Sequence, residues 1–197
     1  DLSNNLKLWR VHLWQTQLTN IDVSMLPELS KLYVSANKLT SLDITNNPKL
    51  TDLRAGENAL TSLDVSNNPL LERLDIFDCD LTKLDVTNNT DLKRLWVQEN
   101  ALKGIDLSKN IQLVEFLASH NNMENIDISN NPNVTKLTLV DNGLIRAYLK
   151  NGNNTIITEF DISNNSSLNC IAVDDVAFSN TNWTNKDAAA SYNTDCS

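Results

Sequence analysis

The stretch LTSLDITNNP, from Leu39 to Pro48, is followed 21 residues later by LTSLDVSNNP, from Leu60 to Pro69. The same interval relates apolar and acidic positions along most of the chain. One apolar column comprises Leu8, Leu29, Leu50, Leu71, Leu92, Leu113 and Val134, a second comprises Val11, Leu32, Leu53, Leu74, Leu95, Phe116 and Leu137, and an acidic column comprises Asp22, Asp43, Asp64, Asp85, Asp106 and Asp127. A fixed period of this length is typical of a repeat architecture, so we expect a stack of equivalent coils.

The repeating unit, L-x-x-L-x-V-x-x-N-x-L-T-x-L-D-V-S-x-N-P-x, matches the leucine-rich-repeat signature at the short end of its length range. Its first half alternates apolar and polar residues, which indicates a strand with one buried face. A single coil cannot bury its own leucines, so the coils must stack and pair their strands. We therefore predict a leucine-rich-repeat solenoid, a right-handed superhelix with a parallel β-sheet on its concave face, short extended segments on its convex face, little helix and a C-terminal cap.

The Asn of the unit recurs where each strand is expected to turn inward. A buried Asn amide supplies both donors and an acceptor to backbone groups that have left the sheet ladder. Cys79 fills this position in the fourth coil, as the signature allows. The Asn column itself consists of Asn37, Asn58, Asn100, Asn121 and Asn142.

The repeats LTSLDVSNN resemble those of bacterial secreted leucine-rich-repeat proteins, both the Bacteroidetes-type surface proteins and the internalin J-like adhesins. The resemblance covers nearly the whole chain. It implies a horseshoe whose concave sheet binds a protein or a glycan. Internalin J-like repeats carry a cysteine ladder, whereas this chain has one cysteine within its repeats, Cys79.

The two ends of the repeat pattern suggest a division into a solenoid over residues 1–169 and a cap over 170–197. The opening residues DLSNN match the tail of a repeat, so we expect the solenoid to start mid-repeat, with an uncapped N-terminal end that either associates or leaves a poorly packed first coil. Near the other end, the pattern predicts an insertion at about 143–155, after which Asp161 rejoins the acidic column.

The three cysteines are expected to play different roles. Cys79 lies in the buried Asn column, where a structural free thiol fits. Cys170 and Cys196 bracket the cap, and a disulfide between them would hold a polar tail that packing alone would not. Such a bond indicates an oxidising, extracellular compartment; the alternative is two unrelated free thiols.

Composition and motifs argue against several functions. A net charge of −9 argues against binding nucleic acid or an anionic membrane surface. The chain lacks a nucleophile elbow, a glycine-rich phosphate loop and a zinc-site spacing, and His12 and His120 lie five coils apart, so we expect no enzyme activity, no cofactor and no metal. The outward Asp column is expected to bond to backbone N–H groups or to the hydroxyls of Thr40, Thr61 and Thr82, with a calcium ladder as the alternative.

The outward columns of the concave strands are the predicted ligand site. They vary from coil to coil, while the core columns barely change. Exposed aromatic side chains on a rigid surface provide contact area at low entropic cost, and Phe77 and Trp96 are expected to form one apolar shelf. The alternative is that these aromatics only reflect strand propensity. The candidate residues are His12, Trp14, Tyr33, Arg54, Arg73, Asp75, Phe77, Arg94 and Trp96.

These observations predict a non-catalytic extracellular module, secreted or at the cell surface, that binds or adheres to a protein or glycan through its concave face, without membrane insertion. Two other functions fit the same sequence. One is a rigid spacer in a multidomain surface protein, and the other is a carbohydrate-targeting accessory domain of a secreted enzyme.

Overall fold

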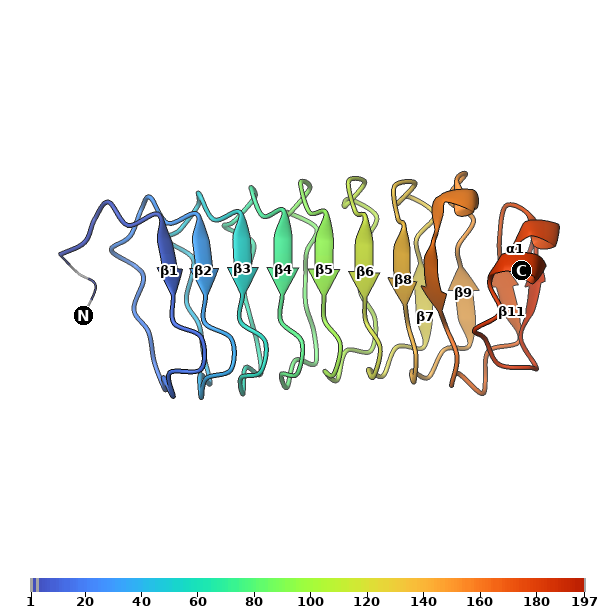
Figure 1. Ribbon diagram of the computed structural model, residues 1–197, viewed down its shortest axis with the longest axis horizontal. Coiled ribbons are helices and arrows are strands. Elements are labelled where there is room, and N and C mark those ends of the chain that lie inside the picture. The colour runs from blue at the N-terminus through green and yellow to red at the C-terminus, as the bar shows by residue number, and fades with distance from the viewer. Residues whose placement is uncertain (1, 3, 197) are drawn as a thin grey trace.

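The computed structural model describes residues 2 and 4–196 and confirms the predicted solenoid (Figure 1). Asp1, where the predicted solenoid begins, Ser3, and Ser197, where the predicted cap ends, lie outside these residues. Eight short parallel strands stand side by side along the long axis, each in register with the next. They are β1 (Arg10–His12), β2 (Lys31–Tyr33), β3 (Asp52–Arg54), β4 (Arg73–Asp75), β5 (Arg94–Trp96), β6 (Glu115–Leu117), β8 (Lys136–Thr138) and β10 (Glu159–Asp161).

The core is a stack of identical layers. The central residue of each strand points inward, so that Leu32 pairs with Leu53 and Leu53 with Leu74, and all three are completely buried. In the second half of each coil, Leu42 and Ile44 are also buried, while Asp43 between them is exposed. Each layer therefore covers the next one, as stacked repeats require.

A left-handed residue and the Asn column together make the turn after each strand. Ala36, Glu57 and Glu99 each have a φ of 55°, a region that non-glycine residues rarely adopt. The Asn58 amide follows this turn; its Nδ2 donates to the carbonyls of Val34 and Ala55, and its Oδ1 accepts from the Leu39 N–H at 2.9 Å. The amide thus ties two coils together and holds the strained turn in place.

A second Asn column, on the convex side of the coils, is also buried. Asn68 Nδ2 donates to the carbonyls of Ile44 and Asn47 in the preceding coil at 3.0 and 2.9 Å. The column consists of Asn47, Asn68, Asn89, Asn110 and Asn131, all with no exposed area. The side-chain amides of this column donate hydrogen bonds to backbone carbonyls at the convex turn, and those of the first Asn column do the same beside the sheet.

The acidic column lies outward on the convex side, and its members bond locally. Asp43 Oδ1 accepts from the backbone N–H and the hydroxyl of Thr45 at 3.0 and 2.7 Å. Asp22 and Asp85 bond in the same way to Ser24 and Thr87. The hydroxyl partners therefore lie two residues downstream, whereas the sequence had suggested Thr40, Thr61 and Thr82.

A second sheet covers the convex side near the C-terminus. It contains β7 (Asn125–Asp127), β9 (Arg146–Tyr148), β11 (Cys170–Ala172) and β12 (Ser191–Asn193). In this sheet Tyr148 pairs with Asp127, so residues 143–155 lie in the convex half of the coil that follows β8, which includes a 3₁₀ turn at Asn154–Ile156. The residues of the predicted insertion are therefore part of this coil, which is only slightly longer than its neighbours.

The coil that follows β8 is slightly longer than its neighbours, and this changes the register of Asp161. Phe160 pairs with Leu137, and Asp161 pairs with Thr138 in the eight-stranded sheet. Asn165 accordingly joins the first Asn column, donating to the carbonyls of Leu139 and Ile162. Asp161 therefore lies on the sheet side, not in the convex acidic column where the repeat comparison placed it.

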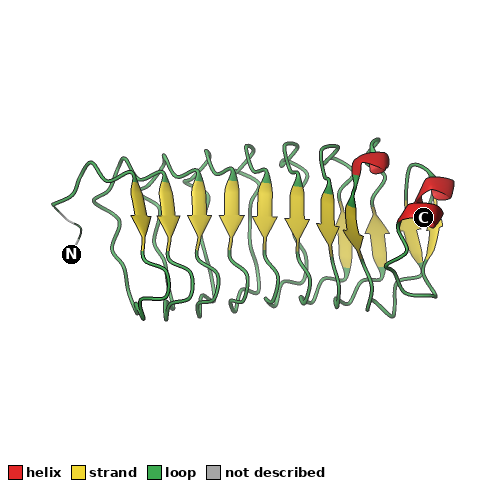
Figure 2. Cartoon of the chain, viewed as in Figure 1, coloured by secondary structure: helices red, strands yellow, loops and turns green. Residues whose placement is uncertain are grey.

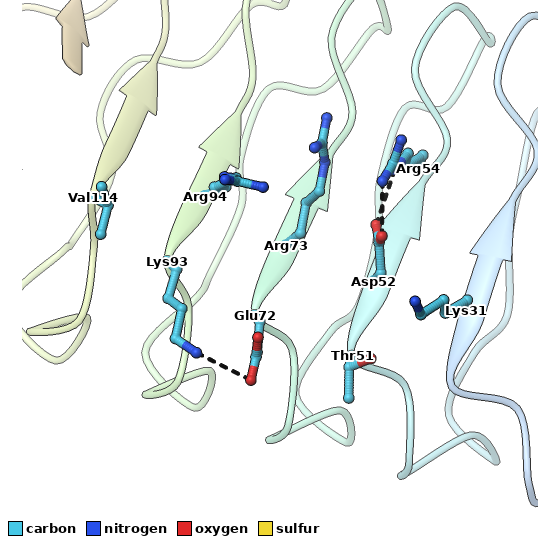
Figure 3. A pocket seen from close by; sticks show the side chains of 9 residues that line it. All are labelled: Lys31, Thr51, Asp52, Arg54, Glu72, Arg73, Lys93, Arg94 and Val114. Atoms are coloured by element: carbon cyan, nitrogen blue, oxygen red, sulfur yellow. Dashed lines mark hydrogen bonds and ion pairs between the residues drawn. The ribbon is translucent and has the colours of Figure 1, made fainter. Parts of the chain in front are cut away.

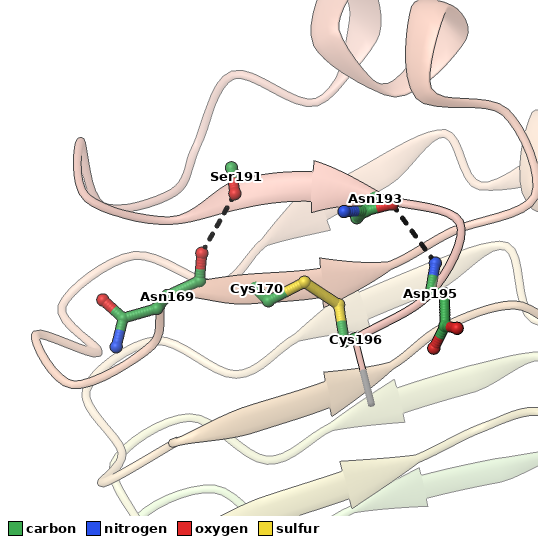
Figure 4. Close-up of a disulfide and its surroundings, with 6 residues drawn as sticks. All are labelled: Asn169, Cys170, Ser191, Asn193, Asp195 and Cys196. Carbon is green, nitrogen blue, oxygen red and sulfur yellow. Dashed lines mark hydrogen bonds between the residues drawn. A yellow bond between two sulfur atoms is a disulfide. The ribbon is translucent and has the colours of Figure 1, made fainter.

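At the C-terminal end, β11, β12 and the helix α1 (Val176–Asn182) cover the last layer of the core. Figure 2 shows the helix in red and the strands in yellow. The Trp183 ring stacks on Phe160 at 4.5 Å, and the Tyr192 hydroxyl donates to the Trp183 carbonyl at 2.6 Å. A disulfide joins Cys170 to Cys196, and Cys79 is a buried free thiol, as predicted (Figure 4).

The opposite end of the solenoid presents apolar side chains to solvent. Leu6, Trp9 and Met25 are 51%, 56% and 54% exposed. Beside them lies a hollow of about 340 Å³ lined mainly by apolar residues that include Leu13 and Leu18. No helix in the described part of the chain is long and apolar enough to cross a membrane.

Candidate functional site

The outer surface of the eight-stranded sheet, which we call the concave face, carries three columns of side chains. A first column contains Arg10, Lys31, Asp52, Arg73, Arg94 and Glu115, and a middle column contains His12, Tyr33, Arg54, Asp75, Trp96 and Leu117. Just past the strands lie Trp14 and Phe77. All nine predicted site residues therefore lie on this face, where hydrogen bonds and ring contacts join most of them into two clusters.

The first cluster is centred on Tyr33. The guanidinium carbons of Arg54 and Arg10 lie 4.4 and 5.0 Å from its ring centroid, and the His12 ring meets it edge-on at 5.4 Å. The Tyr33 hydroxyl donates to Asp52 Oδ2 at 2.7 Å. These contacts fix the orientation of the ring before any ligand arrives.

Asp52 is the anchor of the same cluster. Arg54 donates to both of its carboxylate oxygens, from Nε at 3.1 Å and from Nη2 at 2.9 Å. Burial opposes ionisation of this carboxyl, but the hydrogen bonds from Arg54 and Tyr33 outweigh it and lower the pKa of Asp52. Asp52 therefore stays charged and keeps Arg54 in one bidentate geometry.

The second cluster is built around Trp96. The guanidinium carbon of Arg73 lies 4.1 Å from the Trp96 ring centroid, and the indole Nε1 donates to Glu115 Oε2 at 3.1 Å. Arg73 Nη2 also pairs with Asp75 Oδ2 at 3.2 Å. Asp75 is only 5% exposed, and burial raises the pKa of its carboxyl against the opposing effect of Arg73.

Trp14 and Phe77 behave differently from the shelf that the sequence suggested. Trp14 is 56% exposed, whereas the Phe77 ring lies over Gly56 of the preceding coil, where an added Cβ would come within 2.8 Å of the ring. Within residues 2 and 4–196 no ring–ring contact joins Phe77 to Trp96. Phe77 instead borders a hollow of about 290 Å³ that also includes Trp14 and Tyr33.

A charged pocket of about 360 Å³ lies between the two clusters, beside the first column (Figure 3). Five of its lining residues are cationic, namely Lys31, Arg54, Arg73, Lys93 and Arg94, and two are carboxylates, Asp52 and Glu72. The predicted site omitted Lys31, Asp52, Glu72 and Lys93. The sequence did contain a signal for them, because Lys31 and Asp52 belong to the first column. Glu72 and Lys93 each come directly before a residue of the same column.

The described residues contain no group of three His, Cys, Asp or Glu side chains placed to hold a metal ion. The polar groups of the concave face are arranged instead for ion pairs and hydrogen bonds. They hold cations, carboxylates and aromatic rings in fixed positions.

Comparisons with known proteins show which of them share this fold. No protein-family model and no curated protein matches the sequence. Among solved structures, the functional domain of InlJ from Listeria monocytogenes, which includes a cysteine ladder, is 33% identical with a TM-score of 0.71; the match covers 89% of this chain and 42% of that one. The Leptospira interrogans leucine-rich-repeat protein LIC12759 is 19% identical with a TM-score of 0.62, over 81% and 40% of the two chains.

A plant peptide hormone receptor, RGFR1, shows the same fold at 22% identity and a TM-score of 0.57, over 64% of this chain and 22% of the receptor. This chain thus spans less than half of the length of each of these structures. The chain is a leucine-rich-repeat protein, and its 21-residue repeats fit those of bacterial members such as internalin J.

Proposed function

We propose that the chain is a non-catalytic binding module that recognises an extracellular protein on its concave face. The observation that carries the proposal is the preorganisation of this face. Tyr33 and Trp96 are held by guanidinium groups and by carboxylates, so the ligand meets aromatic and charged groups that are already ordered. Such preorganisation reduces the entropy lost on binding, and Trp, Tyr and Arg are the residues enriched at binding hot spots.

A protein ligand fits the concave face better than a glycan. Sugars stack on open aromatic faces, but the rings of Tyr33 and Trp96 already carry guanidinium groups of this chain at 4.4 and 4.1 Å. The plant receptor RGFR1 was solved in complex with RGF2, so the fold has accommodated a ligand in that protein. Among the aromatic residues of the candidate site, Trp14 is the one with a largely exposed ring.

The extracellular assignment is supported by the bond between Cys170 and Cys196. Structural disulfides persist in oxidising compartments. The 33% identity between this chain and the Listeria InlJ domain supports the same assignment. Adhesion to a cell surface is the corresponding role for the whole protein. The same proposal treats residues 1–169 as the solenoid and 170–197 as its cap.

An array of extracellular proteins and glycans, probed with the isolated chain, tests this function. Each hit is measured again with a double variant, Tyr33→Ala with Trp96→Ala, and with the convex control Lys109→Ala. We expect protein hits whose affinity falls at least about tenfold in the double variant and changes less than about twofold in the control. Hits that are all glycans, or protein hits unaffected by the double variant, contradict the proposal.

A further inference from the structure

The first column of the concave face brings like charges together. Arg73 pairs directly with Arg94 across β4 and β5, and Arg10 pairs with Lys31 across β1 and β2. Like charges opposite each other on neighbouring strands destabilise a sheet. The chain as a whole carries a net charge of −9, so cations concentrated in one pocket are not a consequence of composition.

The pocket keeps part of its positive charge available. Arg54 and Lys93 are paired with Asp52 and Glu72, respectively. Arg94 has only a 3.4 Å contact between its Nε and Glu115 Oε1, and its side chain is 50% exposed. Lys31 has no ion pair with any residue that the structure describes. Lys31, which is unpaired among the described residues, and Arg94, which keeps one long and exposed ion pair, therefore lie at opposite ends of the pocket with charge available to a ligand.

The spacing of these two cations matches an extended peptide. Lys31 and Arg94 lie on β2 and β5, three strand intervals apart, which corresponds to about 14 Å. In an extended chain, side chains on one face recur about every 7 Å, so positions i and i+4 span the same distance. A peptide crossing the strands can thus place one carboxylate at each end of the pocket.

The geometry points to an acidic peptide segment of the protein ligand as the occupant of this pocket. Its carboxylates pair with Arg94 and Lys31, while Asp52 and Glu72 keep the neighbouring cations in place. A densely sulfated glycan fits less well, because Asp52 and Glu72 would face its continuous negative charge. This inference rests on the proposed function and names the chemistry of its ligand.

A fluorescein-labelled peptide of alternating Glu and Ser, about ten residues long, is the probe, and the same peptide with Gln for Glu is its control. The variants Arg94→Gln and Lys31→Gln each remove one cation from an end of the pocket, and Lys109→Gln removes a cation beside Asp106 on the convex side. We expect the Glu peptide to bind at least about tenfold more tightly than the Gln peptide at low salt. Each pocket variant should weaken it about fivefold or more, and Lys109→Gln less than about twofold.

Equal affinity for the Glu and Gln peptides overturns the inference. So does an equal loss in Lys109→Gln and Arg94→Gln, which would mean that only overall charge matters. A heparin fragment that binds where the Glu peptide does not shows that the pocket takes a sulfated glycan instead. A protein ligand that is sensitive to the Tyr33→Ala and Trp96→Ala changes but not to Arg94→Gln or Lys31→Gln overturns this inference alone and leaves the proposed function standing.

Discussion

Arg73 lies over the indole ring of Trp96, with its guanidinium carbon 4.1 Å from the ring centroid. The same guanidinium reaches Asp75 of its own strand at 3.2 Å, and the indole N–H reaches Glu115 on the next strand at 3.1 Å. Trp96 is therefore one member of a network that spans β4, β5 and β6. The ring and its charged neighbours act as one rigid unit on the concave face.

Substituting Trp96→Ala should lower stability modestly. It removes one cation–π contact and one hydrogen bond from a half-buried ring, for a loss of about 1–2 kcal/mol in unfolding free energy. Denaturant titration of the folded chain measures this loss. Trp14→Ala is the control, because Trp14 is 56% exposed, and it should change stability by less than about 0.5 kcal/mol. Equal losses for the two variants would refute the network described for Trp96.

Substituting Asn58→Ala should be costly. It leaves the buried Leu39 N–H without its acceptor and takes one of their donors from the Val34 and Ala55 carbonyls. We expect a loss of about 2–4 kcal/mol. Asn88→Ala, at an exposed turn position, is the matched control and should be nearly neutral. If Asn58→Ala proved as stable as Asn88→Ala, the ladder would have no structural role.

The convex Asp column should produce a stability loss in acid. Asp43 accepts hydrogen bonds from the hydroxyl and the backbone N–H of Thr45. These bonds, that from the hydroxyl most of all, lower the pKa of Asp43 below the ordinary value of 3.8. A carboxyl whose folded-state pKa is depressed stabilises the fold above its unfolded-state pKa. That contribution is lost as the pH falls through the lowered value, so the window lies below about pH 4.

The variant Thr45→Ala tests this assignment. It removes the hydroxyl donor, and the pKa of Asp43 should rise toward its ordinary value in an NMR titration of the side-chain carboxyl. The Asp85 carboxyl, which bonds to Thr87 two coils further along, serves as an internal control and should not move. An unchanged Asp43 titration would show that Thr45 does not hold this carboxylate.

Thiol counting checks the cysteine assignment. The unfolded, non-reduced chain should show one reactive thiol, that of Cys79, since Cys170 and Cys196 are bonded. Reduction should destabilise the C-terminal end by about 3–4 kcal/mol, the chain-entropy value for a loop of this length. Three thiols before reduction would remove the main support for an extracellular protein.

The repeat period was sufficient to predict the core, because the Leu, Val and Ile positions that recur in every coil must all face the interior of the stack. It was not sufficient to place Asp161. Both halves of a coil alternate apolar and polar residues, so FDISNN at residues 160–165 has the same pattern as the convex IDISNN at residues 126–131. Only the length of the preceding coil distinguishes them, and that coil contains extra residues before Phe160.

The contacts within the candidate site could not be predicted either. Tyr33 reaches Asp52 and Trp96 reaches Glu115 by the same diagonal step, from the middle column of one strand to the first column of the next. Column positions show that such residues are neighbours. Side-chain rotamers decide which neighbour is bonded, and a sequence pattern does not specify them.

The most direct test of the concave face as the binding surface is to block it and measure the affinity for a protein ligand from the array. Leu117→Cys places a thiol beside Trp96 in the middle column, and Lys109→Cys places one on the convex side. Cys79 is buried, and burial raises the pKa of its thiol, so a polyethylene-glycol maleimide modifies the introduced thiol in the folded chain. Modification at position 117 should weaken binding at least about tenfold, and at 109 less than about twofold. Undiminished binding after modification at 117 would contradict the account.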